Sequence, residues 1–463
     1  MMIDTALLNK YNVPVPRYTS YPTVPFWNEH MDILEWQSAF QQQFQTENQN
    51  RGISIYIHLP FCESLCTYCG CNKKITTNHS VEEEYMDAIY SEWNNYRQLM
   101  TEPPVIREMH LGGGTPTFFS PANLEKLVNT ILKDAIIHPQ YEFSIEGHPN
   151  NTTAAHLTTL YNIGFRRISF GVQDNNPEVQ RIINRIQPFA NVQRVTELAR
   201  TTGFTAVNFD HIYGLPRQTT QTIHKSILQS LQLRPDRVAF YSYAHVPWTS
   251  RGQRLFNEND LPDSALKMEL YQTGRQLFLD HGYTDIGMDH FALPGDALYL
   301  AWQNGTLHRN FMGYTTQHSG LLLGLGVSAI SDIGIAFAQN HKTLHDYYKS
   351  VQSCSVESNQ SISLPVTKGY FLTKEDEAFR EYIMNVICRG ATEFQSDHLP
   401  LLQQYTFPEL TLLEADQLIN WNETGLQVTT LGRHFLRNIC KAFDLHLLRR
   451  EQTAEKPLFS KAI

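Results

Sequence analysis

The sequence predicts an α/β protein built on a partial (β/α)6 TIM-like barrel, with an N-terminal arm and a helical C-terminal domain. Six short β-rich runs alternate with segments of helical periodicity, and this order requires right-handed crossovers and a parallel sheet. Polar residues follow nearly every run. Such residues at the carboxyl ends of successive strands are typical of the active face of a barrel, whereas an open α/β sheet collects its ligands at one switch point.

The expected elements follow one another at regular spacing. The six strands are expected at 54–59, 107–111, 141–146, 166–171, 205–210 and 236–243. Helices are expected between them, for example over 82–96, 120–134 and 174–186, and Ser120 followed by Pro121 is a typical helix start. A further helix is expected over 336–350, after a stretch rich in Gly, His and aromatic residues.

The chain divides into three parts. Residues 1–50 form the arm, which contains PRYTSYPT (16–23), and residues 51–350 form the barrel domain with its C-terminal extension. After a polar linker over 353–365, an amphipathic pattern over 366–463 indicates a helical domain. Its Cys388 and Cys440 are expected to be small buried hydrophobic residues.

Composition narrows the class of protein. The chain has 37 Lys and Arg against 46 Asp and Glu, a formal charge of −9, which argues against a broad nucleic-acid surface. No apolar run approaches the roughly 20 residues of a membrane span. The first residues also lack the apolar core and cleavage site of a signal peptide. We therefore expect a cytoplasmic protein that neither spans a membrane nor binds nucleic acid.

The strongest motif is CESLCTYCGC, which contains Cys62, Cys66, Cys69 and Cys71. Without a secretion signal, such clustering favours a metal or redox centre over disulfides. Zinc sites usually combine two separated ligand pairs, and no second cluster of Cys or His lies nearby. Three thiolates in a CxxxCxxC loop can instead hold three irons of a [4Fe–4S] cluster and leave the fourth iron open to a small chelating ligand. Cys71 is one residue too far round the loop and is expected to stay off the cluster.

A CxxxCxxC loop directly after a first strand, followed about forty residues later by LGGGTPT (111–117), resembles the radical S-adenosylmethionine (SAM) family. The further motifs YTSYPT, CGCNK, FGVQD, DHIYGLP, GMDHFA, LHRNFMGYTTQ, GVSAIS and a terminal FSKAI resemble the oxygen-independent coproporphyrinogen III oxidases. This resemblance implies that a 5′-deoxyadenosyl radical starts the oxidative decarboxylation of two propionates of coproporphyrinogen III to vinyls, which gives protoporphyrinogen IX.

The same resemblance assigns the cofactor-binding residues. It implies that Cys62, Cys66 and Cys69 bind the cluster, and that Tyr56, the glycine loop with Gly113, Glu146 and Ile330 contact the cluster-bound SAM. A second SAM would be bound by Tyr68, Gly114, Thr115, Gln173, Arg185, Asp210 and Ala244. For each polar residue the alternative is a hydrogen-bonded group of the barrel interior.

Recognition of the substrate calls for cations, because coproporphyrinogen III carries four carboxylates and planar guanidinium groups pair well with them. Arg17 and Arg309 are the candidates, and each is otherwise an ordinary surface or inter-domain Arg. Tyr18 and Tyr21 either flank the tetrapyrrole, with the arm as a lid over the substrate site, or anchor the arm to the barrel. His290 and His308 are not expected to bind a metal.

Three residues depart from the family pattern. His148 stands where an acidic residue is usual, His211 where an aliphatic residue is usual, and Met312 where Gln is usual. They flank the expected second SAM and substrate region. The resemblance also implies a monomer that receives electrons from a protein such as a flavodoxin or a ferredoxin. The alternatives are a haem chaperone and a haem-degrading radical SAM relative.

Overall fold

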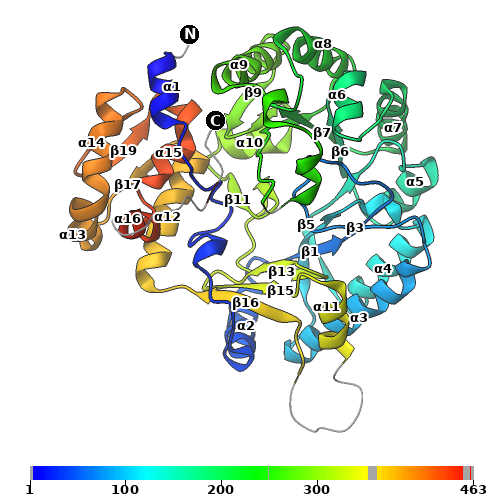
Figure 1. The fold of residues 1–463 in the computed structure, drawn as a ribbon. Coiled ribbons are helices and arrows are strands. Elements are labelled where there is room, and N and C mark those ends of the chain that lie inside the picture. The colour runs from blue at the N-terminus through cyan, green and yellow to red at the C-terminus, as the bar shows by residue number, and fades with distance from the viewer. Residues whose placement is uncertain (1–3, 249, 353–361, 452–458, 460–463) are drawn as a thin grey trace.

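The computed structural model describes residues 4–248, 250–352, 362–451 and 459 (Figure 1). The expected linker over 353–365 and the terminal FSKAI motif lie mostly outside the described residues. In the part of the chain that is described, no helix is long and apolar enough to cross a membrane.

The centre of the molecule is one open sheet of twelve strands, in the order β16-β15-β14-β13-β1-β4-β5-β6-β7-β8-β10-β9. Its parallel core contains all six expected strands, at β1 (Ile53–Leu59), β4 (Val105–Gly113), β5 (Ile136–Gly147), β6 (Arg167–Gln173), β7 (Ala206–Tyr213) and β8 (Arg237–Ser242). A seventh parallel strand, β13 (Leu322–Leu325), pairs with the other edge of β1. Since the strand order does not close on itself, the prediction of a partial barrel is confirmed.

Helices cover the outer face of this curved sheet, as Figure 1 shows. They are α3 (Val81–Leu99), α4 (Pro121–Leu132), α5 (Ala154–Asn162), α7 (Phe189–Thr202), α8 (Thr220–Leu231) and α9 (Ser264–Asp280). The Ser120 side chain accepts a hydrogen bond from Asn123 N–H and caps α4, as the sequence predicts. The helix expected over 174–186 is shorter, because α6 (Pro177–Ile182) is followed by Asn184 in the left-handed region at φ 51°.

The sheet continues beyond β13 with short antiparallel strands. They are β14 (Ile330–Asp332), β15 (Ala336–Asn340) and β16 (Val366–Phe371). The helix expected over 336–350 is therefore wrong for its first half: α11 begins only at Leu344 and ends at Gln352. All five residues of β15 are buried between two partner strands, and its apolar residues Ala336, Phe337 and Ala338 form too short a run to distinguish a buried strand from a helix.

The C-terminal part combines helices with a small sheet that the sequence analysis did not predict. Its helices include α12 (Lys374–Arg389), α14 (Phe407–Ala415), α15 (Leu436–Lys441) and α16 (Leu445–Glu451). Its strands β17 (Ala391–Glu393), β18 (Ile419–Asn422) and β19 (Gly425–Val428) pair in the order β17-β19-β18. Cys388 and Cys440 are buried in its core, as expected. Because β16 belongs to the barrel sheet, the structural transition lies after Phe371.

The N-terminal arm packs against both of these parts. Helix α2 (Ile33–Glu47) buries Trp36, Phe40 and Phe44 in the barrel core. Helix α1 (Thr5–Tyr11) lies beside the C-terminal helices in Figure 1, and the Tyr11 hydroxyl hydrogen-bonds to the Asp416 carboxylate. The arm therefore links the barrel to the C-terminal part.

One buried carboxylate connects α3 to the antiparallel edge of the sheet. Glu92 is fully buried and accepts hydrogen bonds from Gly326 N–H at 2.8 Å, the Tyr347 hydroxyl at 2.6 Å and the Asn340 side-chain amide at 2.7 Å. Burial raises the pKa of Glu92 to about 7, although these three donors favour its charged form.

We expect the substitution Glu92→Ala to lower the free energy of unfolding by about 3 kcal/mol, because three buried donors lose their acceptor at once. Urea unfolding followed by circular dichroism measures the change. Glu83→Ala, at an exposed position of the same helix, is the matched control and should change stability by less than about 0.5 kcal/mol. Equal stability of the two variants would contradict the role assigned to Glu92.

Candidate functional site

The carboxyl ends of the parallel strands surround a cavity of about 580 Å³. The side chains and backbone that line it come from the cysteine loop after β1, the glycine loop after β4, and the ends of β5, β6 and β7. Many of the residues predicted from the sequence line it together: Cys62, Cys66, Tyr68, Cys69, Gly113, Gly114, Thr115, Glu146, Gln173, Arg185 and Asp210. Residues far apart in the sequence therefore meet at one face of the barrel.

The cysteine loop is tied to the glycine loop by backbone hydrogen bonds. Gly114 N–H donates to Leu59 O at 2.9 Å, and Thr115 N–H donates to Phe61 O at 3.0 Å. A Cβ atom at Gly114 would lie 2.5 Å from Pro60 O, so only glycine permits this approach. The contact fixes the position of Cys62, the last residue of β2 (Phe61–Cys62), relative to the end of β4.

Polar groups adjoin each of the three cysteines. The Cys62 thiol lies 3.2 Å from the Thr115 hydroxyl, and Arg185 Nη1 donates to Cys66 Sγ at 3.5 Å. Lys73 Nζ donates to Cys69 O at 3.0 Å. A metal group bound to these thiolates would carry negative charge. The Arg185 and Lys73 cations and the Thr115 hydroxyl would stabilise that charge.

The thiols differ in their proton affinities. Burial raises the pKa of Cys62 to about 11, against the hydrogen bond with Thr115. A hydrogen bond with Cys71, together with the charges of Lys73 and Arg185, lowers the pKa of Cys69 to about 6 against the effect of burial. The same contact with Cys69 raises the pKa of Cys71 well above its ordinary value. Cys69 is therefore the thiol that ionises most readily of these three.

This donor set fits an iron–sulfur cluster better than a single metal ion. Among the described residues, no group of three or more His, Cys, Asp or Glu side chains converges on a point where one ion would be held. Cysteines that each bind a different iron of a cluster stay further apart than the ligands of one ion. Three half-buried thiols that line one cavity beside Arg185 meet that requirement.

Glu146 is held as a carboxylate at the end of β5. Gly113 N–H donates to its Oε2 atom at 3.2 Å, and His110 Nε2 lies 3.5 Å from its Oε1 atom. Burial opposes ionisation, but these two contacts outweigh it and hold the pKa of Glu146 below its ordinary value. The His110 ring stacks on Tyr56 with an interplanar angle of 15°. His110 was not predicted from the sequence, although it directly precedes the LGGGTPT motif.

Asp210 at β7 has the opposite electrostatic setting. Burial and the charge of Glu146 raise the pKa of Asp210 to about 7, against a hydrogen bond of 3.0 Å from the Ser169 hydroxyl. The cavity thus presents one ionised carboxylate and one that takes up a proton near neutral pH.

At the end of β6, Gln173 adopts the left-handed region at φ 65°, and Arg185 Nη2 donates to Gly171 O at 2.7 Å.

Three predicted residues, Ala244, Ile330 and Tyr56, lie beside the cavity without lining it. Gln253, which the sequence analysis missed, donates to Tyr68 O at 3.0 Å and to Ala244 O at 3.2 Å, so that Ala244 adjoins Tyr68. Ile330 is the first residue of β14, and its backbone lies against Gly324. Gly324 in turn pairs in register with Tyr56 of β1. Tyr56 itself also lies just outside the cavity lining, beside Gly112.

The predicted substrate residues divide into two pairs. Tyr18 and Tyr21 are both buried. The Tyr18 hydroxyl donates to the Asp444 carboxylate at 3.1 Å, and the Tyr21 hydroxyl accepts from Leu445 N–H at 3.1 Å. They therefore anchor the arm, and the partner is the C-terminal part instead of the barrel. Arg17 does not line the cavity but lies near it: its guanidinium is 5.8 Å from the ring centroid of Tyr241, which lines the cavity, and it donates to Ser242 O at 2.8 Å and pairs with Asp289 at 3.6 Å.

A smaller cavity of about 120 Å³ lies deeper in the barrel and shares Glu146, Ser169, Asp210 and Tyr241 with the first. Met312 and His290 line it. Arg309 is buried beside it, with its guanidinium 4.9 Å from the Tyr314 ring centroid, and its Nε and Nη1 atoms have no hydrogen-bond partner among the described residues. A buried guanidinium with spare donors is suited to an anionic group.

The three departures from the family pattern occupy different positions. His148 lines the cavity of about 580 Å³ at the strand ends, and its Nδ1 atom accepts a hydrogen bond from Asn150 N–H at 3.1 Å. Burial and then the charge of Arg185 lower the pKa of His148 to about 2, so it is neutral at physiological pH. His211 is fully buried and lines neither cavity, whereas Met312 lines only the deeper one.

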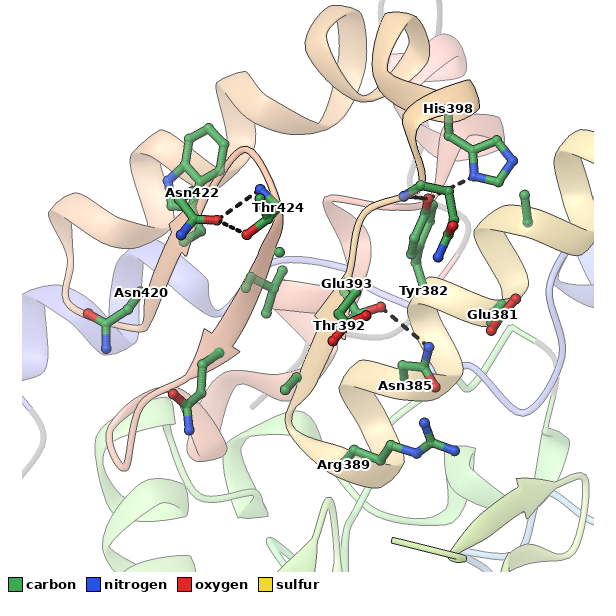
Figure 2. A pocket seen from close by; sticks show the side chains of 17 residues that line it. Glu381, Tyr382, Asn385, Arg389, Thr392, Glu393, His398, Asn420, Asn422 and Thr424 are labelled. Atoms are coloured by element: carbon green, nitrogen blue, oxygen red, sulfur yellow. Dashed lines mark hydrogen bonds between the residues drawn. The ribbon is translucent and has the colours of Figure 1, made fainter.

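A further pocket, of about 750 Å³, lies in the C-terminal part between α12 and the small sheet. Figure 2 shows its polar lining, in which Asn385 hydrogen-bonds to Thr392 and Tyr382 hydrogen-bonds to His398. None of the residues predicted as functional lies in it.

Comparison with known proteins relates the whole chain to one family. The model of the radical SAM superfamily matches residues 56–229. The oxygen-independent coproporphyrinogen III oxidase of Escherichia coli is 38% identical over 99% of this chain and 98% of its own. That of Synechocystis sp. is 37% identical over 99% of this chain and 97% of its own. The solved structure of the Escherichia coli coproporphyrinogen III oxidase, described as a radical SAM enzyme, superposes with a TM-score of 0.87 at 36% identity and covers 96% of this chain and 99% of that chain.

We expect Gly114→Ala to disrupt the contact between the two loops, because its methyl group would meet the Pro60 carbonyl. Stability should fall by roughly 1–3 kcal/mol, and iron loading after anaerobic reconstitution should fall with it. Gly70→Ala in the cysteine loop is the matched control, since a Cβ atom there meets nothing within 4 Å. Normal iron loading of Gly114→Ala would show that the close approach is dispensable.

Proposed function

The chain belongs to the radical SAM superfamily and, within it, to the oxygen-independent coproporphyrinogen III oxidases; from this membership we propose that its barrel cavity converts two propionates of coproporphyrinogen III to vinyls and so gives protoporphyrinogen IX. The observation that carries the proposal is the match over nearly the whole chain, with the arm and the C-terminal part included. That extent favours this reaction over the haem-chaperone and haem-degrading alternatives, which the cysteine loop alone would permit.

Membership of the superfamily implies a [4Fe–4S] cluster and SAM. When bound, the cluster and SAM supply the 5′-deoxyadenosyl radical that removes a hydrogen atom from a propionate β-carbon. Cys62, Cys66 and Cys69 would hold the cluster. Each propionate loses one hydrogen atom, one carbon dioxide and one electron, and two propionates require two rounds.

The ionised Glu146 is suited to hold the amino group of the cluster-bound SAM. Tyr56, Gly113 and Ile330 would contact the same SAM. Its depressed pKa keeps the negative charge at neutral pH, and a carboxylate with that charge attracts an ammonium group. His110 keeps Glu146 in place through the contact at Oε1.

A second SAM is part of the proposal. Its binding residues would be Tyr68, Gly114, Thr115, Gln173, Arg185, Asp210 and Ala244. What supports this assignment is that all but Ala244 line the same cavity, and that Gln253 holds Ala244 next to Tyr68. The buried guanidinium of Arg185 suits a carboxylate, whereas Asp210 suits a polar or cationic group.

For the substrate we propose Arg17 and Arg309 as carboxylate-binding residues. Arg17 reaches Tyr241 at the cavity, and Arg309 has unused donors beside the deeper cavity. The arm would cover the substrate site as a lid anchored by Tyr18 and Tyr21. We further propose that the protein acts as a monomer and takes electrons from a flavodoxin or a ferredoxin.

Under anaerobic conditions, reconstituted protein with SAM, reductant and coproporphyrinogen III should form 5′-deoxyadenosine and vinyl products together. Mass spectrometry of the tetrapyrrole and chromatography of the nucleoside measure both. Omission of SAM is the control. Tight haem binding without any decarboxylation would refute the proposal in favour of a haem-binding role.

Cys66→Ala should abolish the brown absorption of the cluster and lower the iron content, since one of three ligands is lost. Cys71→Ala removes a neighbouring thiol of the same loop and should keep both. Iron and sulfide analysis after reconstitution measures the effect. A cluster that survives Cys66→Ala but not Cys71→Ala would exchange the roles of the two residues.

A further inference from the structure

Two segments lie against the outside of the cysteine loop. Thr67 N–H donates to Ile183 O at 2.9 Å, which joins the loop to the end of α6. The Ser250 hydroxyl donates to Cys69 O at 3.2 Å, and Gln253 donates to Tyr68 O, which joins the loop to the segment of residues 244–248 and 250–262. The surface around the cysteine loop is thus formed by the loop itself (62–74), by residues 177–186, and by the described residues 244–248 and 250–262.

A small separate core fixes these segments to one another. Val179 and Ile183 of the α6 segment pack with Tyr243, and Tyr68 and Phe256 pack against them. Each of the three segments contributes at least one apolar side chain to this cluster. The three therefore form one supported surface around the cysteine loop.

This surface exposes large apolar side chains. Ile186 is 64% exposed, Trp248 69% and Leu255 72%, which makes them three of the ten exposed large hydrophobic residues among those described. Single exposed apolar residues are ordinary, but several on adjoining segments are typical of an interaction surface. Ile186 also lines the cavity that contains the cysteine loop.

The charges of the same surface differ from those of the whole chain. Apart from the cavity-lining Glu63, Lys73 and Arg185, its segments carry Lys74, Arg181, Arg251 and Arg254 against three carboxylates, whereas the chain has a net charge of −9. Arg181, Arg251 and Arg254 are exposed, and within the described residues none of them forms an ion pair with a carboxylate. The acidic residues of these segments are Glu63, Glu178, Glu258 and Asp260, and Asp260 is paired with Arg217.

We propose that this surface, with Trp248 and Leu255 as its apolar centre and Arg181, Arg251 and Arg254 around them, docks a reduced, acidic one-electron carrier protein. The proposal rests on the proposed function, because a cluster that drives the reaction must be reduced from outside. In the step, the carrier loses one electron and the cluster gains one, and no atom or proton is transferred. Arginines steer an acidic partner to the surface, and the apolar residues supply contact area in a small transient interface.

The position of the surface favours an electron carrier over other occupants. The backbone of Thr67, Tyr68 and Cys69 lies directly beneath the two covering segments, so a bound protein approaches the cysteine loop without entering the cavity. The cavity lining remains available to SAM and the tetrapyrrole.

The test uses the full-length, cluster-loaded protein and reduced flavodoxin as the probe. Binding is measured by titration at low and high salt, and turnover is measured separately with flavodoxin and with dithionite, a small reductant that needs no docking. We expect the double substitution Arg251→Glu and Arg254→Glu to weaken flavodoxin binding at least about tenfold and to remove most of its salt dependence. Dithionite-driven turnover and the KM for coproporphyrinogen III should not change.

Two further variants complete the design. Trp248→Ser should weaken flavodoxin binding without altering its salt dependence, since it removes contact area and no charge. Lys126→Glu with Lys133→Glu makes the same change of charge on exposed positions of the outer helix α4 and its end, and should leave binding unchanged.

The outcomes separate the two levels of the proposal. Flavodoxin binding that is unchanged in the Arg251 and Arg254 variant overturns the docking surface, while turnover with dithionite still supports the proposed function. A raised KM for the tetrapyrrole with dithionite assigns the surface to substrate entry and also overturns docking. Absence of turnover in the unaltered protein with dithionite refutes the proposed function itself.

Discussion

The close approach of the glycine loop to the backbone after β1 is the contact on which the rest of the site depends. Gly114 and Thr115 donate to Leu59 and Phe61, and a Cβ atom at Gly114 would meet the Pro60 carbonyl. The contact places Thr115 against Cys62 and, through Gly113, an N–H group against Glu146. The cysteines and the carboxylate that would serve a cofactor are therefore positioned by the same short stretch of backbone.

Hydrogen bonds and neighbouring charges distinguish the two carboxylates of the cavity, since burial raises the pKa of both. Glu146 is ionised because Gly113 and His110 outweigh its desolvation, whereas Asp210 has one hydroxyl donor and a nearby negative charge, and its pKa rises to about 7. One strand end thus presents a fixed negative charge to a cation. The other presents a group whose charge responds to what binds beside it.

The N-terminal arm connects the barrel to the C-terminal part. The arm buries α2 in the barrel core and anchors Tyr18 and Tyr21 on the C-terminal part, so both parts are held through it. Arg17 directly precedes Tyr18, and its guanidinium lies 5.8 Å from the ring centroid of Tyr241, which lines the cavity. A segment that contacts both parts and the cavity is well placed to cover a large substrate.

The sequence by itself determined the six parallel strands, the cysteine and glycine loops, and the family, because each depends on local periodicity or on closely spaced residue types. It did not determine β15, whose three apolar residues Ala336, Phe337 and Ala338 fit a strand or a helix until β14 and β16 pair with it. Nor did it reveal His110 beside Glu146, Gln253 beneath Tyr68, or the burial of Tyr18 and Tyr21 against the C-terminal part. These contacts join residues 36 to more than 400 positions apart, and only the tertiary structure decides them, because packing and desolvation depend on neighbours in space.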